Sequence, residues 1–125
     1  MKSNSRACIA YVAASLGGAK GASVYDYSQS KHINISGTVS ANNISIYDYD
    51  RSCHVSGSAS NLYDYGNSAH IQLNMNGKQF SGYDYHTSSH FSGTLNGNSF
   101  SIYDYETSAY YRTQTSGDRQ DAAAA

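Results

Sequence analysis

The tripeptide Tyr-Asp-Tyr occurs five times in this chain, and its spacing constrains the fold more than any other feature. The copies begin at Tyr25, Tyr47, Tyr63, Tyr83 and Tyr103, so consecutive copies are 22, 16, 20 and 20 residues apart. A motif that returns at such intervals indicates a repeated supersecondary unit rather than one irregular globule. We therefore expect a repeat architecture built from five related units.

Two patterns within the units predict β-structure. The dipeptide Asn-Gly, which begins at Asn76 and at Asn96, is a strong signal for a two-residue hairpin turn. Residues 71–75 and 100–102 alternate apolar and polar side chains with the period of two that is typical of strands. Each unit is therefore expected to contain two strands, with one turn at Asn-Gly and the other at Tyr-Asp-Tyr.

The central Asp of each copy is predicted to cap its own turn, because a short carboxylate accepts hydrogen bonds from backbone N–H groups that follow it. For Asp84 we expect a donor near Thr87 or Ser88. The glycine pattern of calcium-binding nonapeptide repeats is absent from the chain. We assign a structural turn-capping role to Asp26, Asp48, Asp64, Asp84 and Asp104.

Strand pairing favours an all-β fold, a repetitive antiparallel meander in a single sheet, with a β-solenoid as the alternative. Folding at the two Asn-Gly turns is expected to place Leu73 opposite Phe80 and Phe91 opposite Ile102. A four-residue loop at the intervening Tyr-Asp-Tyr copy then places Phe80 opposite Phe91, which gathers the apolar residues on one face. The unit lengths differ by even numbers, as a sheet requires, because a one-residue slip turns every side chain to the other face. We expect the residues that are added in the 22-residue unit and removed in the 16-residue unit to lie at the Asn-Gly turn position.

Composition divides the chain into three segments. Residues 1–23 place Lys2 and Arg6 before a mildly apolar run and a series of small residues, which is the layout of a secretory signal peptide. Cleavage would follow Ala19 or Ser23. The alternative is a short amphipathic N-terminal helix that packs over the sheet. Residues 24–115 form the β-repeat domain, and residues 116–125 have no apolar pattern and are expected to be a disordered tail. A signal peptide implies a secreted or cell-surface protein.

Charge and motifs exclude several classes of function. The net charge is −1 and the eight basic residues are scattered singly, so no basic patch exists for a nucleic acid. No stretch reaches the roughly 20 apolar residues of a transmembrane segment. Neither a Gly-x-Ser-x-Gly elbow nor a His-Glu-x-x-His motif occurs. We expect a protein that is not an enzyme and that binds no cofactor.

The histidines follow the repeat but do not predict a metal site. Each of His32, His54, His70 and His90 stands five residues after the second Tyr of its unit. In a meander these side chains lie on alternate strands, about 9–10 Å apart, too far for one zinc ion. In a solenoid they would stack more closely, so a metal is tied to the alternative fold.

The second face of the sheet combines aromatic rings with hydroxyl groups. Around Tyr83 it would carry Ser81, Ser88, His90, Ser92 and Thr94. Tyr and Thr are common on solvated sheets, and a carbohydrate-binding surface uses the same groups for stacking and hydrogen bonding. The candidate ligand-binding residues are Tyr47, Tyr63, Tyr83, Tyr103, His70 and His90.

Two functional hypotheses follow. An open sheet leaves one apolar face and two strand edges, near residues 24–27 and 109–115, and such surfaces favour self-association. The first hypothesis is an exported, tyrosine-rich, non-catalytic protein that serves as a surface, matrix or self-assembling interaction module. The alternative is a monomeric module whose Tyr/Ser/His face binds a carbohydrate or a cell-wall polymer.

Overall fold

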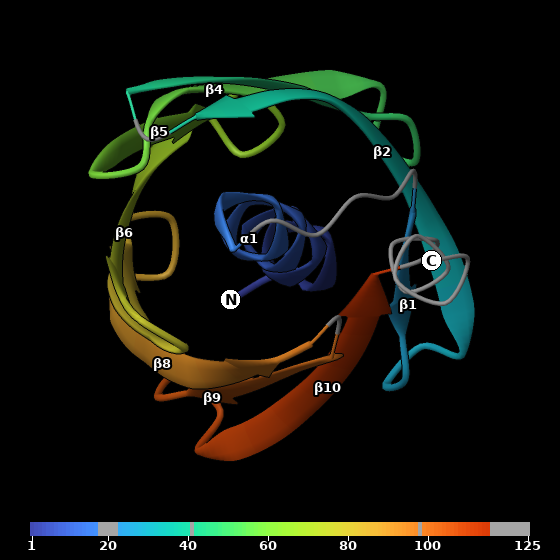
Figure 1. Cartoon of the computed structure of the whole chain (residues 1–125), viewed down its shortest axis with the longest axis vertical. Coiled ribbons are helices and arrows are strands. Elements are labelled where there is room, and N and C mark those ends of the chain that lie inside the picture. Colours follow the sequence, from blue (N-terminus) through green and yellow to red (C-terminus); the bar gives the residue numbers. More distant parts are fainter. Residues whose placement is uncertain (18–22, 41, 98, 116–125) are drawn as a thin grey trace, which may run out of the picture.

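Within residues 1–17, 23–40, 42–97 and 99–115, which the computed structural model describes, ten antiparallel strands close into a barrel around one helix (Figure 1). The predicted tail at 116–125 and the cleavage position at Ala19 lie outside the described residues. The elements are α1 (Ser3–Leu16), β1 (Ser23–Asp26), β2 (Lys31–Ser40), β3 (Asn43–Asp48), β4 (Cys53–Ser58), β5 (Asn61–Asp64), β6 (Ala69–Asn76), β7 (Gln79–Asp84), β8 (Ser89–Asn96), β9 (Ser99–Asp104) and β10 (Ala109–Thr115).

The strands follow one another around the barrel in chain order, which confirms the antiparallel meander and excludes the solenoid. The expected open sheet with two free edges is wrong, because β1 pairs with β10 and places Val24 opposite Thr115. Closure satisfies the backbone groups that both edges would otherwise expose. It also encloses the apolar face, which in an open single sheet would remain in water.

The hairpin registers differ from the predicted ones by two residues. Met75 lies opposite Phe80, and Phe91 lies opposite Gly82 on one side and Asp104 on the other. The difference arises at the Asn-Gly turn. Asn76 is still part of the strand and pairs with Gln79, so the two loop residues are Gly77 and Lys78 and not Asn76 and Gly77. Gly77 is then the first loop residue, with φ 63°, which is the glycine position of a type II′ turn. A register shift of two residues leaves every side chain on the same face of the sheet, so the predicted apolar residues are buried together as expected.

Differences in unit length are absorbed by the strands and not by the turns. In the longest unit, β2 has ten residues, and Ser40 still pairs with Asn43 across a two-residue loop. In the shortest unit, β4 and β5 have six and four residues, and Ser58 pairs with Asn61 in the same way. The expectation that the turns would take up these differences is therefore wrong.

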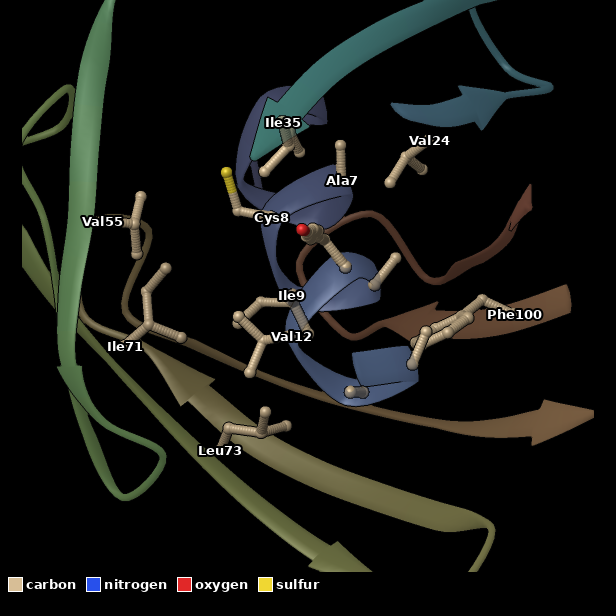
Figure 2. Close-up of a cluster of buried hydrophobic side chains, with 14 of the residues drawn as sticks. Ala7, Cys8, Ile9, Val12, Val24, Ile35, Val55, Ile71, Leu73 and Phe100 are labelled. Carbon is tan, nitrogen blue, oxygen red and sulfur yellow. The ribbon is translucent and has the colours of Figure 1, made fainter. Parts of the chain in front are cut away.

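The N-terminal helix that was the alternative for residues 1–23 is present as α1, but it lies inside the barrel and does not pack over an open sheet (Figure 1). It is not amphipathic: every residue from Ser5 to Ala14 is buried, as expected of a helix that is surrounded by other elements. Figure 2 shows Ile9 and Val12 among wall residues that include Ile71 and Leu73. Each fully buried aliphatic side chain of this size contributes about 2 kcal/mol to folding.

Glycines on the inner wall make room for large side chains on the neighbouring strands. Gly82 lies opposite Phe91, and Gly93 lies opposite Phe80. A Cβ at Gly93 would come within 2.7 Å of Phe80 Cζ, and one at Gly82 would collide with the ring of Phe91. These positions keep the wall thin, so the barrel holds both the phenylalanine rings and the helix.

The central Asp of every Tyr-Asp-Tyr copy points into the barrel and is almost completely buried. One carboxylate oxygen accepts the backbone N–H two residues later, at 2.9–3.0 Å in all five turns. For Asp84 this backbone donor is His86, one residue before Thr87, and the Thr87 hydroxyl donates to the second carboxylate oxygen at 3.3 Å. Ser88 itself has φ 54°, and the equivalent serine ends each of the other four turns in the same left-handed conformation. We refer to Asp26, Asp48, Asp64, Asp84 and Asp104 as the Asp ring.

The amino terminus of the chain and the first turn of α1 are anchored to the Asp ring by polar contacts with the second carboxylate oxygens. Asn4 Nδ2 donates to Asp48 at 3.1 Å and Ser5 Oγ donates to Asp64 at 3.2 Å. The amino group of Met1 forms an ion pair with Asp104 at 3.0 Å. Negative charge near a helix N-terminus is also favoured by the helix dipole. The ring therefore fixes both the turns and the depth of the helix.

Two arginines balance part of this buried charge. Arg51, in the turn between β3 and β4, donates from Nε to Asp48 at 2.7 Å and from Nη2 to Asp64 at 3.1 Å. Burial opposes the charge on Arg51, but these hydrogen bonds outweigh it and raise the pKa of the guanidinium. Arg6 of α1 lies 3.9 Å from Asp26, and its Cζ lies 3.8 Å from the centre of the Tyr111 ring.

Candidate functional site

The outer wall carries five ring clusters, one for each Tyr-Asp-Tyr copy. The first tyrosine and the Asp of each copy are the last two residues of a strand, so they point to opposite faces, the tyrosine outward and the Asp inward. The second tyrosine is the first residue of the turn, and its ring packs against that of the first on the outer wall. In the fourth unit the Tyr83 ring lies 4.7 Å from the Tyr85 ring and 4.8 Å from the His90 ring, measured between centroids, in edge-to-face geometry. The other clusters repeat this arrangement as Tyr25–Tyr27–His32, Tyr47–Tyr49–His54, Tyr63–Tyr65–His70 and Tyr103–Tyr105–Tyr110.

The structure brings the predicted site residues together in pairs across hairpins. Tyr63 contacts His70 and Tyr83 contacts His90, each at 4.8 Å between ring centroids. Tyr47 and Tyr103 hold the same position in their own clusters. These four first tyrosines are partly buried, because each is enclosed between two other rings. Edge-to-face contacts contribute about 0.5–1.5 kcal/mol each beyond buried area, so the first tyrosines have a structural role as well.

The second tyrosines are the rings that sequence reasoning missed. Tyr85 is 54% exposed and Tyr105 is 55% exposed, and the second tyrosines of the other copies are similar. A signal was present in the sequence, since the alternation of the strand, continued by one residue into the turn, places the second tyrosine on the same face as the first. An accessible ring of this kind is better placed to contact a ligand than the half-buried first tyrosine.

Hollows on the outer wall lie between neighbouring hairpins. One, of about 630 Å³, is lined by His70 and Gln72 of one hairpin and by Tyr85 of the next. A second, of about 420 Å³, is lined by the residues 20 positions later, His90, Ser92 and Tyr105. The same three positions thus line both hollows, which makes the hollow a property of the repeat.

A third hollow extends the polar surface toward β10. It measures about 680 Å³, and its lining includes Asn74, Ser81, Ser92, Thr94 and Tyr103. The three hollows are lined mainly by rings, hydroxyls and amides, with Ala69 and Ile71 in one of them, and none of their lining residues is Asp, Glu, Lys or Arg. The surface therefore offers ring faces for stacking and neutral groups for hydrogen bonds, without a charge that would select an ionic ligand.

The described part of the chain contains no group of three or more His, Cys, Asp or Glu side chains arranged to hold a metal ion. The repeated histidines stand on alternate strands and each packs against a tyrosine. Among the described residues, no helix has the length and apolar character needed to cross a membrane. The thiol of Cys8 is buried beside Asp48, and burial together with this carboxylate raises its pKa, so the thiolate is disfavoured.

Comparison of this chain with protein-family models, with curated proteins and with solved structures finds no match. Function is therefore inferred from the outer wall itself.

Proposed function

We propose that this protein is a non-catalytic module that binds neutral carbohydrate on the outer wall of its barrel. The observation that carries the proposal is the recurring hollow between hairpins, which is lined by an exposed tyrosine, a histidine and hydroxyl and amide side chains. Aromatic rings stack on the C–H faces of pyranose sugars, while hydroxyl and amide side chains bond the sugar hydroxyls. Glucose and N-acetylglucosamine in β-linkage present flat C–H faces, so glycans of this class are the expected ligands.

The absence of charge from the lining favours a neutral glycan over an anionic polymer. A nucleic acid or an acidic polysaccharide would call for Lys or Arg in the hollows, and the described hollows have neither. Glycoside hydrolysis generally requires two carboxylates on either side of the bond that is cleaved. The Asp ring faces the barrel interior, so its carboxylates are not available to a ligand on the outer wall. Binding without cleavage is the consistent proposal.

The two structural premises of self-assembly do not hold in this fold. The predicted strand edges pair with each other, and the apolar face is covered by α1. A monomeric module is therefore the form that we propose. An extracellular location remains part of the proposal, since such glycans are abundant there. Removal of residues 1–23 as a leader would take away α1, so we expect an exported form to retain this helix.

The test is retention on insoluble microcrystalline cellulose and chitin, with the full chain and with the variant Tyr85→Ala, Tyr105→Ala. We expect the wild type to be retained on at least one polymer. Loss of a stacking contact of about 1 kcal/mol at each site should weaken binding roughly fivefold per site. The matched control is Tyr85→Phe, Tyr105→Phe, which keeps the rings and should be retained. Failure of the folded wild type to bind either polymer would contradict the proposal.

A further inference from the structure

The second tyrosines do not all meet the preceding hairpin in the same way. We use the term junction for the place where the backbone N–H of a second tyrosine donates to the strand before it. At three junctions the acceptor is the carbonyl oxygen of the repeated histidine, at 3.0–3.1 Å. These pairs are Tyr65 with His54, Tyr85 with His70 and Tyr105 with His90.

At the other two junctions the register is shifted by two residues. Tyr49 donates to the carbonyl of Asn34 at 3.0 Å, two residues beyond His32, and Tyr27 donates to Arg112 at 3.2 Å, two residues beyond Tyr110. The first shift arises from the long strand β2. The second lies at the closure of the barrel, where β1 meets β10. Neither tyrosine therefore faces the ring of the preceding unit.

At these shifted junctions the tyrosine hydroxyl is engaged with the wall. The hydroxyl of Tyr49 lies 3.1 Å from Ser36 Oγ, and that of Tyr27 donates to Gln114 at 2.8 Å. The Arg112 guanidinium also lies over the Tyr27 ring, with Cζ 5.5 Å from its centroid. In contrast, the hollows that combine a histidine with the next second tyrosine occur at regular junctions, beside Tyr85 and beside Tyr105.

We infer that the barrel has three equivalent glycan sites and not five, and that it binds three separate glycan segments at once. Two of the sites are the hollows at the regular junctions of Tyr85 and Tyr105. The third is assigned to Tyr65, because its backbone N–H donates to the carbonyl of His54 in the same register. This inference rests on the proposed function and specifies its valency. Two sites at adjacent junctions are two strands apart, about 9.5 Å along the wall. Five hairpins complete the barrel, so each site is turned from the next by about a fifth of the circumference.

This geometry determines what the protein does to a polysaccharide. A stiff β-linked chain that lies flat in one hollow cannot follow the curved wall into the next. Each site is then free to take a different chain, and the protein acts as a cross-linker. One binding event does not exclude the others, because the sites face different directions. Cross-linking is an activity beyond simple retention on a surface.

The first experiment is an NMR titration of the full chain with cellohexaose and with chitohexaose, monitored through the histidine ring signals. We expect signals of His54, His70 and His90 to shift with similar affinities. His32 lies in an equivalent ring cluster but not at a regular junction, so its signal should not move. A similar shift of His32 would overturn the distinction between the two kinds of junction.

The second experiment separates valency from binding. In a solution of hydroxyethylcellulose, the wild type should raise the viscosity through cross-links. The variant Tyr65→Ala, Tyr105→Ala should keep one site at Tyr85, still shift His70, and lose the viscosity effect. The control variant Tyr27→Ala, Tyr49→Ala should behave as the wild type does.

The outcomes distinguish this inference from the proposed function. One hexasaccharide per protein, with affinity that rises with chain length across all sites, would overturn separate binding but leave the carbohydrate proposal intact. Binding without any viscosity effect in the wild type would likewise overturn cross-linking alone. Absence of any histidine shift with either hexasaccharide, together with no retention on cellulose or chitin, would overturn both.

Discussion

The inner and outer faces of the barrel are built from the same tripeptide but have opposite properties. Inside, each Asp is almost fully buried and has a fixed turn donor, and four of the five also contact α1, an arginine or the amino group of Met1. Outside, the two tyrosines of each copy pack against neighbouring rings and against side chains on the outer face of the adjacent strands. The second tyrosine is about half-exposed. The inner face has little freedom to change, because every polar atom that loses its partner there remains buried. The outer face is the part of the wall that is free to vary and to bind.

The comparison also shows how a repeat produces unequal sites. The inner contacts differ from unit to unit, since a single helix without fivefold symmetry meets a ring of five similar Asp residues. Asp64 meets Ser5 and Arg51, whereas Asp84 receives its side-chain hydrogen bond from Thr87 of its own turn. The outer clusters are nearly identical in geometry, and the junctions between them differ only where the register shifts.

The largest expected effect on stability comes from removing the helix that fills the inner face. Deletion of residues 1–22 removes α1 and its buried side chains, a loss on the order of 10 kcal/mol. Because domains of this size are stable by only about 5–15 kcal/mol, the shortened chain should show no cooperative thermal unfolding. The control Ile9→Val should cost only about 1 kcal/mol. Cooperative melting of the shortened chain at the temperature of the full chain would show that α1 is not part of the core.

A second prediction compares an inner arginine with an outer one. Arg51→Ala leaves Asp48 and Asp64 without their main cation, and breaking a buried ion pair typically costs about 3 kcal/mol or more. Arg112→Ala removes an exposed guanidinium that lies over Tyr27, with an expected cost of about 0.5–1 kcal/mol. Urea denaturation of both variants measures the difference. An equal loss of unfolding free energy in the two variants would mean that the inner and outer faces tolerate the removal of an arginine equally well.

The smallest expected effect concerns how the stability depends on pH through Asp50, in the turn between β3 and β4. Asn4 and Lys31 donate to Asp50, and these hydrogen bonds lower the pKa of its carboxyl. A lowered pKa stabilises the fold above the unfolded-state value, and this contribution is lost as the pH falls through the folded-state value. Asp50→Asn should therefore cost about 0.2–1 kcal/mol at neutral pH, as exposed pairs do. Urea denaturation of the wild type and of Asp50→Asn at decreasing pH should show the difference in unfolding free energy vanish. A difference that increased as the pH fell would contradict a lowered pKa of Asp50.

Sequence reasoning predicted the local parts of this fold and missed the closed form. The strand pattern, the hairpins and the inward-facing apolar set followed from alternation, which depends only on neighbouring residues. The register was wrong by two because the turn uses Gly77 as its first loop residue, a choice between two turn types that the dipeptide alone does not settle. At the candidate site, His70, His90 and the first tyrosines were identified, whereas the more exposed second tyrosines and the hollows beside them were not.

What the sequence determined by itself is the repeat, the two-strand unit and the assignment of each side chain to one of two faces. These properties depend on spacing along the chain, and a spacing of two residues has the same meaning in any sheet. The tertiary structure alone decided that the sheet closes, that residues 3–16 fill it, and that three junctions differ from the other two. Closure depends on the register accumulated around ten strands and on an interior wide enough for a helix. Those conditions are met only when residues far apart in the chain come together, as Val24 and Thr115 do at the last pair of strands.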